Sequence, residues 1–192
     1  MTSILRGVVV SGAVSLLCAL IISARAGEDP KAWRPMVISD LTLPGPQQAT
    51  LVGIWADQIA ANNQRAGRLQ MSTQAPKATV LPANVHARAA SVVVRSPDVV
   101  LQLSLFEAHG ACESVGSSSG VLRCPLRLVR FEKGATTIRE GRGCFAAGKA
   151  GSVDPVAYAS YDPATHMIRL GVIARGEAVE GCSQSVPVKE SQ

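Results

Sequence analysis

The sequence predicts a mainly β fold: an antiparallel meander that forms a small barrel or sandwich, with one short helix near residues 47–63. Apolar and polar residues alternate over several short segments after residue 86, which is the period of a half-buried strand. Turn residues separate these segments at regular intervals, as in antiparallel all-β domains. Four cysteines follow residue 110, and small exported domains commonly use disulfides in this way.

The helix prediction covers residues 47–63. Apolar residues recur there at steps of three and four: Val52, Trp55, Ile59 and Ala60. Gly45-Pro46 precedes them, and proline suits the first helical turn. Asn62-Asn63 is the expected end of the helix. The stretch Ala49–Trp55 also contains β-branched residues, so a strand there is the alternative.

The first predicted hairpin flanks Ser96-Pro97. A two-residue loop would pair Val94 with Val99 and place the apolar residues of both strands on one face. It would also bring Arg95 opposite Asp98, where the opposite charges attract. Proline at the second loop position is unusual for such a turn, so a longer loop is the alternative.

Two further hairpins follow. Lys133-Gly134 is the expected turn between strands 121–132 and 135–147. That register pairs Arg127 with Glu140, an opposition of charges that suits an exposed face. The third hairpin turns at residues 162–165, where Asp followed by Pro fits a type I turn. A last strand is expected to end by Ser185.

Residues 1–26 read as a secretory signal peptide. They contain no acidic residue, one early charge (Arg6), an apolar run and the small-residue site Ala24-Arg25-Ala26. A retained membrane anchor is the alternative, because the run is at the lower limit of a bilayer span. Cys18 follows Leu17, which is too large for a lipidation site, so it is assigned to the apolar signal core.

Cleavage would leave an extended Pro-rich arm (27–46), one disulfide-stapled β-rich domain (47–185) and a polar tail (186–192). A short strand is expected around Met36–Leu41 in the arm, with Trp33 and Val37-Ile38 pinning the arm to the domain. Removing Arg6 and Arg25 lowers the formal net charge from +5 to +3. An excess of that size does not imply a nucleic-acid partner, and the few aromatic residues disfavour base stacking.

The disulfide candidates form an even set in an exported chain: Cys112, Cys124, Cys144 and Cys182. One pairing joins Cys124 to Cys144 across the second hairpin through a one-residue bulge. The other joins Cys112 to Cys124 and Cys144 to Cys182, and we favour it because Cys112 and Cys182 lie where strands meet loops. The wide spacing, without a C-x-x-C motif, predicts neither a metal site nor a redox pair.

No residue pattern identifies a catalytic site or a cofactor. Glu107 and His109 lie two apart at a strand end and so share a face, which could serve an acid/base pair with His86 or His166. Polar surface at a strand end is the simpler interpretation. The serines of segment 116–120 lack the strand-to-helix turn of a nucleophile elbow.

Basic residues crowd the second hairpin and could form a cationic surface: Arg123, Arg127, Arg139 and Arg142. Arg130 takes the other strand face, and Lys133 lies at the tip. Such a surface would suit an anionic partner, whereas Glu132 and Glu140 favour a simply solvated, charge-balanced face.

We therefore expect an exported, periplasmic or secreted, non-enzymatic β-domain. It would bind a protein or small ligand through its loops or barrel mouth, as an inhibitor or envelope accessory factor. Its expected partner is an envelope protein or an anionic surface, with membrane association only if the signal is retained as an anchor. The alternative function is an envelope hydrolase that uses Glu107 and His109.

Overall fold

The computed structural model describes residues 33–42, 44–72, 86–95, 99–116, 120–133, 135–148 and 154–188. Several sequence-based predictions lie wholly or partly outside these ranges. They are the signal peptide at residues 1–26, the start of the arm, the Ser96-Pro97 turn, the serines of segment 116–120, Gly134 of the second turn and the end of the polar tail. Within the described ranges, no helix is both long enough and apolar enough to cross a membrane.

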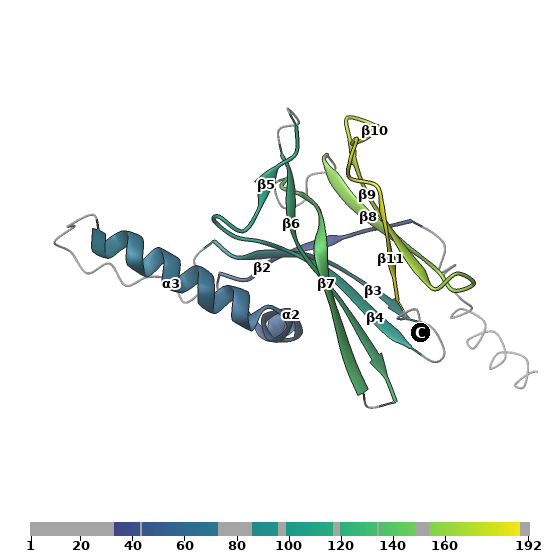
Figure 1. Cartoon of the computed structure of the whole chain (residues 1–192), viewed down its shortest axis with the longest axis horizontal. Helices are drawn as coiled ribbons and strands as arrows, with labels where there is room; N and C mark the ends of the chain where they lie inside the picture. The colour runs from purple at the N-terminus through teal and green to yellow at the C-terminus, as the bar shows by residue number, and fades with distance from the viewer. Residues whose placement is uncertain are drawn as a thin grey trace, which may run out of the picture.

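Two antiparallel sheets form the fold (Figure 1). Sheet I consists of β2 (Val37–Asp40), β3 (Arg88–Arg95), β4 (Val100–Glu107), β6 (Val121–Glu132) and β7 (Ala135–Ala146), and the short β5 (Glu113–Ser114) also pairs with β6. Sheet II consists of β1 (Arg34–Pro35), β8 (Val156–Asp162), β9 (Met167–Ala174), β10 (Glu177–Ala178) and β11 (Gln184–Pro187). The predicted fold class is confirmed, and the sheets form an open sandwich, not a closed barrel.

The main core lies between the two sheets. Alternate residues of the strands supply it, among them Leu101, Leu103 and Leu105 of β4, Leu126 and Leu128 of β6, and Ile168 and Leu170 of β9. All of these side chains are at least 95% buried. Successive side chains of a strand point to opposite faces, so the alternation seen in the sequence becomes one apolar inner layer.

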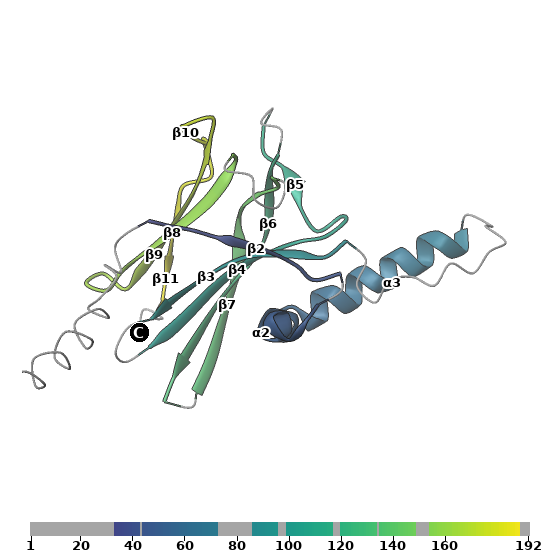
Figure 2. The same ribbon diagram turned by 180° about the vertical axis from the view of Figure 1, so that it is seen from behind.

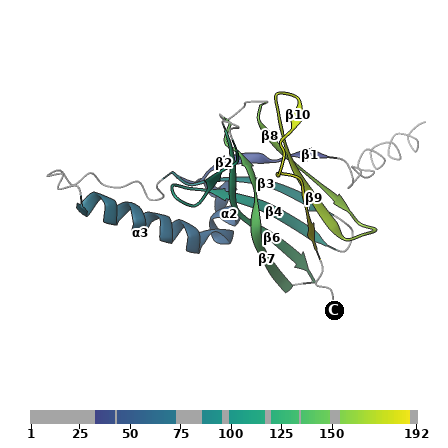
Figure 3. The same cartoon turned by 45° about the horizontal axis from the view of Figure 1, so that its top comes forward.

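The described part of the predicted arm contributes a strand to each sheet. β1 pairs with β8 of sheet II, whereas β2 pairs with β3 of sheet I, and Figure 3 shows the arm passing from one sheet to the other. Met36, between the two strands, is buried, and its N–H donates to the Ala157 carbonyl at 2.8 Å. Of the expected anchor residues, Ile38 packs against the main core, whereas Trp33 and Val37 are wrong, since they are 54% and 66% exposed.

The helical segment starts with a single 3-10 turn, η2 (Pro46–Gln48), and continues as α2 (Ala49–Ile54) and α3 (Ala56–Ser72). Its start agrees with the prediction. The expected end at Asn62-Asn63 is wrong, because asparagine is a weak helix former but does not break a helix, and Asn62 is buried. The helices cover part of the outer face of sheet I, around Phe106, and α3 projects beyond both sheets (Figures 1 and 2).

The β6–β7 hairpin has the predicted register, including Glu132 opposite Ala135 and Arg127 opposite Glu140. In the β3–β4 hairpin, Val94 pairs with Leu101 instead of Val99, so the loop is two residues longer than the two-residue turn. A shift of two residues leaves every side chain on its predicted face. The apolar pattern therefore predicts the buried face of both strands correctly, even though the predicted loop length is wrong.

Both disulfides follow the second of the two pairings considered. Cys112 bonds to Cys124, and Cys144 bonds to Cys182. Cys144 lies on β7 and Cys182 between β10 and β11, so this bond ties sheet I to sheet II. Two internal disulfides are compatible with an oxidising location outside the cytoplasm.

Candidate functional site

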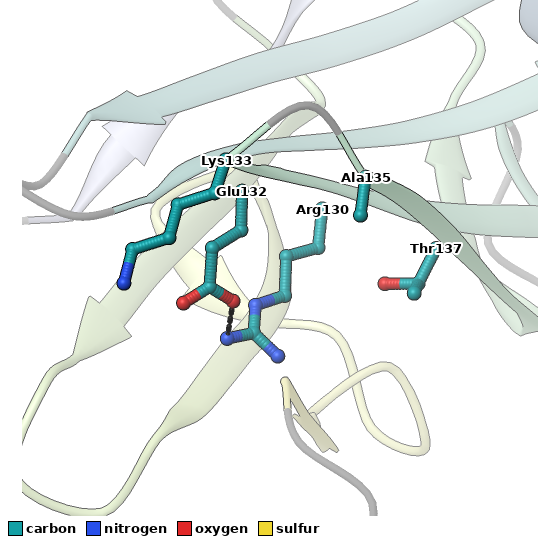
Figure 4. Close-up of a pocket in the computed structure, with 5 residues that line it drawn as sticks. All are labelled: Arg130, Glu132, Lys133, Ala135 and Thr137. Carbon is teal, nitrogen blue, oxygen red and sulfur yellow. Dashed lines mark hydrogen bonds and ion pairs between the residues drawn. The ribbon is translucent and has the colours of Figure 1, made fainter.

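A pocket of about 240 Å³ lies at the outer end of the β6–β7 hairpin. Arg130 and Glu132 of β6, Lys133 of the turn, and Ala135 and Thr137 of β7 line it (Figure 4). A volume of this size is below that of drug-sized ligand pockets and suits one small chemical group.

The hairpin register brings these side chains together. Arg130 lies opposite Thr137, and Glu132 lies opposite Ala135. Directly opposed residues share a face of the sheet, and this face is the one that carries Leu126 and Leu128 into the core further along β6. The pocket therefore forms where the inner face of sheet I changes from apolar to polar residues.

Arg130 is the central side chain of the pocket. Its side chain is 20% exposed, and its Nη2 atom donates to Glu132 Oε2. Its Nε atom is buried and lacks a hydrogen-bond acceptor within the part of the chain that the structure describes. A buried donor without an acceptor costs free energy, so a shift of the Arg130 side chain that exposes Nε to a ligand oxygen would be compensated by the new hydrogen bond.

Two cations and one carboxylate line the pocket, which leaves one excess positive charge. In the view of Figure 4, the Lys133 ammonium and the Thr137 hydroxyl lie on opposite sides of the Arg130 guanidinium. A guanidinium, an ammonium and a hydroxyl are donors that carboxylate and phosphate oxygens accept from. The chemistry of the pocket therefore favours a small anionic group.

Tyr161 of β8 lies close enough to Arg130 for the two to interact across the sheets. Burial raises the pKa of Tyr161, and the positive charge of Arg130 acts in the opposite direction. The Tyr161 hydroxyl is 3.3 Å from His166 Nδ1. The charge of Arg130 therefore acts on a residue of sheet II.

The structure divides the predicted cationic surface. Arg123 and Arg142 are both exposed, and Arg142 Nη2 donates to the Arg123 carbonyl at 2.9 Å. Arg142 also pairs with Glu113 at 3.2 Å, and Arg123 Nη2 donates to the Gly181 carbonyl at 3.0 Å. Arg139 is half-buried on β7. These contacts tie the two exposed arginines to neighbouring segments of the fold.

Arg127 lies on the opposite face of sheet I and is 9% exposed, so the expectation of an exposed face is wrong for it. Its guanidinium stacks over Trp55 at 4.7 Å, and it donates to Asp57, to Glu140 and to the Ile54 carbonyl. Arg127 is buried because the helix pair packs on this part of the face. Arg127 anchors the helices and is not a surface cation.

Among the described residues, the hydrogen-bond partner of Glu107 is Arg88, and no hydrogen bond joins it to His109. Arg88 Nε donates to Glu107 Oε2 at 2.7 Å, which engages the carboxylate, and His109 is exposed. His166 lies beside Tyr161 on the other sheet. Among the described residues, no group of three or more His, Cys, Asp or Glu side chains is arranged to hold a metal ion.

The sequence reasoning missed the pocket, although it separated Arg130 from the other arginines by strand parity. The signal that could have found it is the pairing of Arg130 with Thr137 in the predicted register. Comparisons of the chain with protein-family models, curated proteins and solved structures find no match.

Proposed function

We propose that this chain is an exported, disulfide-bonded β-domain whose function is binding, and that it binds an anionic group of a protein or small ligand at the tip of the β6–β7 hairpin. The observation that carries the proposal is the buried Arg130 Nε without an acceptor, in a pocket that Lys133 also lines.

The position of the pocket supports binding to a partner's carboxylate or phosphate group. The pocket lies at a turn, and hairpin turns on rigid β scaffolds are common binding elements. Glu132 already neutralises part of the Arg130 charge, so the site suits a single anionic group better than a highly charged polymer. Export of the domain would place such a partner in the cell envelope or outside the cell.

The test uses the full chain, expressed with its own N-terminal segment and purified in the oxidised form. Acetate and inorganic phosphate are titrated separately at constant ionic strength, and backbone amide NMR shifts are followed. We expect saturable shifts at Lys133 and Thr137, and their loss in Arg130→Gln. Either probe is small enough for a pocket of about 240 Å³.

Arg169→Gln is the matched control, because Arg169 is an exposed arginine of β9 that does not line the pocket. It removes the same charge from the protein and should leave the shifts unchanged. Shifts that spread evenly over the basic residues without saturating, or that persist in Arg130→Gln, would contradict the proposal.

A further inference from the structure

Strand β7 forms an edge of sheet I. Within the described residues, β6 is the only strand with which it pairs. Its first eight residues, 135–142, are exposed apart from the half-buried Arg139. An edge strand presents backbone N–H and C=O groups that a further strand can bind.

The hydrogen-bond pattern identifies which residues of β7 point these groups outward. Ala147 N–H donates to the Gly120 carbonyl at 2.6 Å, in the same register that pairs Glu132 with Ala135. Bonded pairs alternate along an antiparallel ladder, so the odd-numbered residues of β7 bond to β6. The backbone groups of Thr136, Ile138 and Glu140 therefore point away from the sheet.

The fold covers one end of this edge and leaves the other end open. Gln184 Nε2 donates to the Arg142 carbonyl at 2.9 Å, which satisfies the next outward-facing group along the strand. Among the described residues, no hydrogen bond from another segment reaches the outward backbone groups of Thr136, Ile138 or Glu140. The open edge, defined as residues 135–141, is thus seven residues long.

The side chains beside the open edge form a row across the outer face of sheet I. Val93 pairs with Gln102, Gln102 with Val129, and Val129 with Ile138. Val129 is buried, whereas Val93 and Ile138 are 37% and 52% exposed. The row therefore ends at the open edge in an exposed isoleucine.

We infer that the open edge of β7 pairs with the same edge of a second copy of this chain, antiparallel and with Ile138 opposite Ile138 of the other copy. A two-fold axis perpendicular to the sheet then joins the two copies of sheet I into one continuous sheet. The three outward-facing residues of each copy supply the hydrogen bonds of the new ladder.

Charge and the length of the ladder together select this register among the symmetric ones. An axis through Glu140 would place two carboxylates opposite each other, and an axis through Arg139 would place two guanidinium groups opposite each other. Like charges directly opposed in a ladder are unfavourable. An axis through Ile138 opposes two isoleucines and pairs Thr136 with Glu140, while keeping all seven residues of the open edge in the ladder.

The first test is sedimentation velocity of the oxidised full chain over a range of concentrations. We expect a concentration-dependent dimer, and we expect Ile138→Lys to raise its dissociation constant at least about tenfold because it opposes two ammonium groups. Val37→Lys is the matched control, since Val37 is exposed on β2 at the opposite edge of sheet I. It should leave the dimer unchanged.

The second test reads the register directly. Hydrogen-bonded partners in an antiparallel ladder have Cα atoms about 5.5 Å apart, which a disulfide can bridge. Ile138→Cys should therefore form a covalent dimer on mild oxidation, whereas Thr136→Cys should not, because its partner is Glu140. A monomer at every concentration, or equal cross-linking of the two variants, would overturn the inference. If the edge pairs with a strand of a different protein instead, the purified chain should stay monomeric, which is the first of these two contradicting outcomes.

Discussion

Arg127 of β6 and Asp57 of α3 lie 70 residues apart in the chain and are joined by two hydrogen bonds of 2.6 and 2.7 Å. Asp57 is in the first turn of its helix, where a negative charge also stabilises the helix dipole. Trp55 lies just before this turn. Its Nε1 donates to Ser104 Oγ at 3.1 Å, and its ring stacks on Phe106 at 5.1 Å. The contacts of Trp55 and Arg127 together fasten the helices to sheet I.

Arg127→Ala should destabilise the protein more than Asp57→Asn. The first change removes four sets of contacts, including the stacking on buried Trp55, and we expect it to cost about 3 kcal/mol. The second leaves Glu140 and the Ile54 carbonyl as partners of Arg127 and removes a carboxylate that is 58% exposed, so about 1 kcal/mol is expected.

Urea unfolding followed by Trp55 fluorescence measures both free energies in a Trp33→Phe background, which removes the exposed tryptophan. Equal losses in the two variants would show that Arg127 contributes nothing beyond its bonds to Asp57.

The same ion pair predicts a pH dependence. Hydrogen bonding from Arg127 lowers the pKa of Asp57 from 3.8 to about 2. A carboxyl whose pKa is lower in the folded state stabilises the fold above the pKa of the unfolded state, and this contribution is lost as the pH falls through the folded value. The difference in unfolding free energy between wild type and Asp57→Asn should therefore shrink between pH 3.8 and about 2.

Comparison with Asp57→Asn isolates this carboxyl, because every other acidic group titrates in both proteins. Urea titrations at closely spaced pH values give the measurement, and a difference that stays constant down to pH 2 would contradict the assigned ion pair.

Loss of the Cys144–Cys182 disulfide should cost more stability than loss of Cys112–Cys124. Their sequence separations are 38 and 12 residues, and the longer loop loses more chain entropy in the unfolded state. The difference is about 1 kcal/mol in the loop-entropy description. The comparison uses two variants, each with both cysteines of one bond changed to alanine, and measures their unfolding free energies in urea. Equal values, or the opposite order, would point to strain or residual structure.

Local patterns predicted the parts of the fold that depend on neighbouring residues. The turn at Lys133-Gly134 and the alternation of its flanking strands gave the β6–β7 register. The same reasoning placed Arg130 on the opposite face from Arg127. For the β3–β4 hairpin, each side chain was placed on the correct face of the sheet, although the predicted loop was two residues too short. The alternation of apolar residues determines the face, whereas the loop length determines the register.

Contacts between distant segments were beyond this reasoning. The pairing of Arg127 with Glu140 in the hairpin does not depend on whether that face of the sheet is exposed or covered. Asp57 reaches Arg127 only because α3 docks on this face. The pocket has the same origin. Strand parity shows that Arg130 and Thr137 share a face of sheet I. The position of sheet II determines which part of that face is buried in the core and which part lines the pocket.

Gly143→Ala should be destabilising, whereas Gly141→Ala, two residues earlier on β7, should be tolerated. A Cβ atom at Gly143 would lie 2.8 Å from both Gln184 Nε2 and Leu105 Cδ2, whereas the nearest atom to one at Gly141 is 3.9 Å away. Overpacking of this kind costs about 1–3 kcal/mol. The clash would also push Gln184 away from the Arg142 carbonyl. The hydrogen bond between these two groups closes one end of the open edge. Thermal unfolding of the two variants provides the measurement, and equal melting temperatures would show that the Gln184 and Leu105 side chains shift without cost.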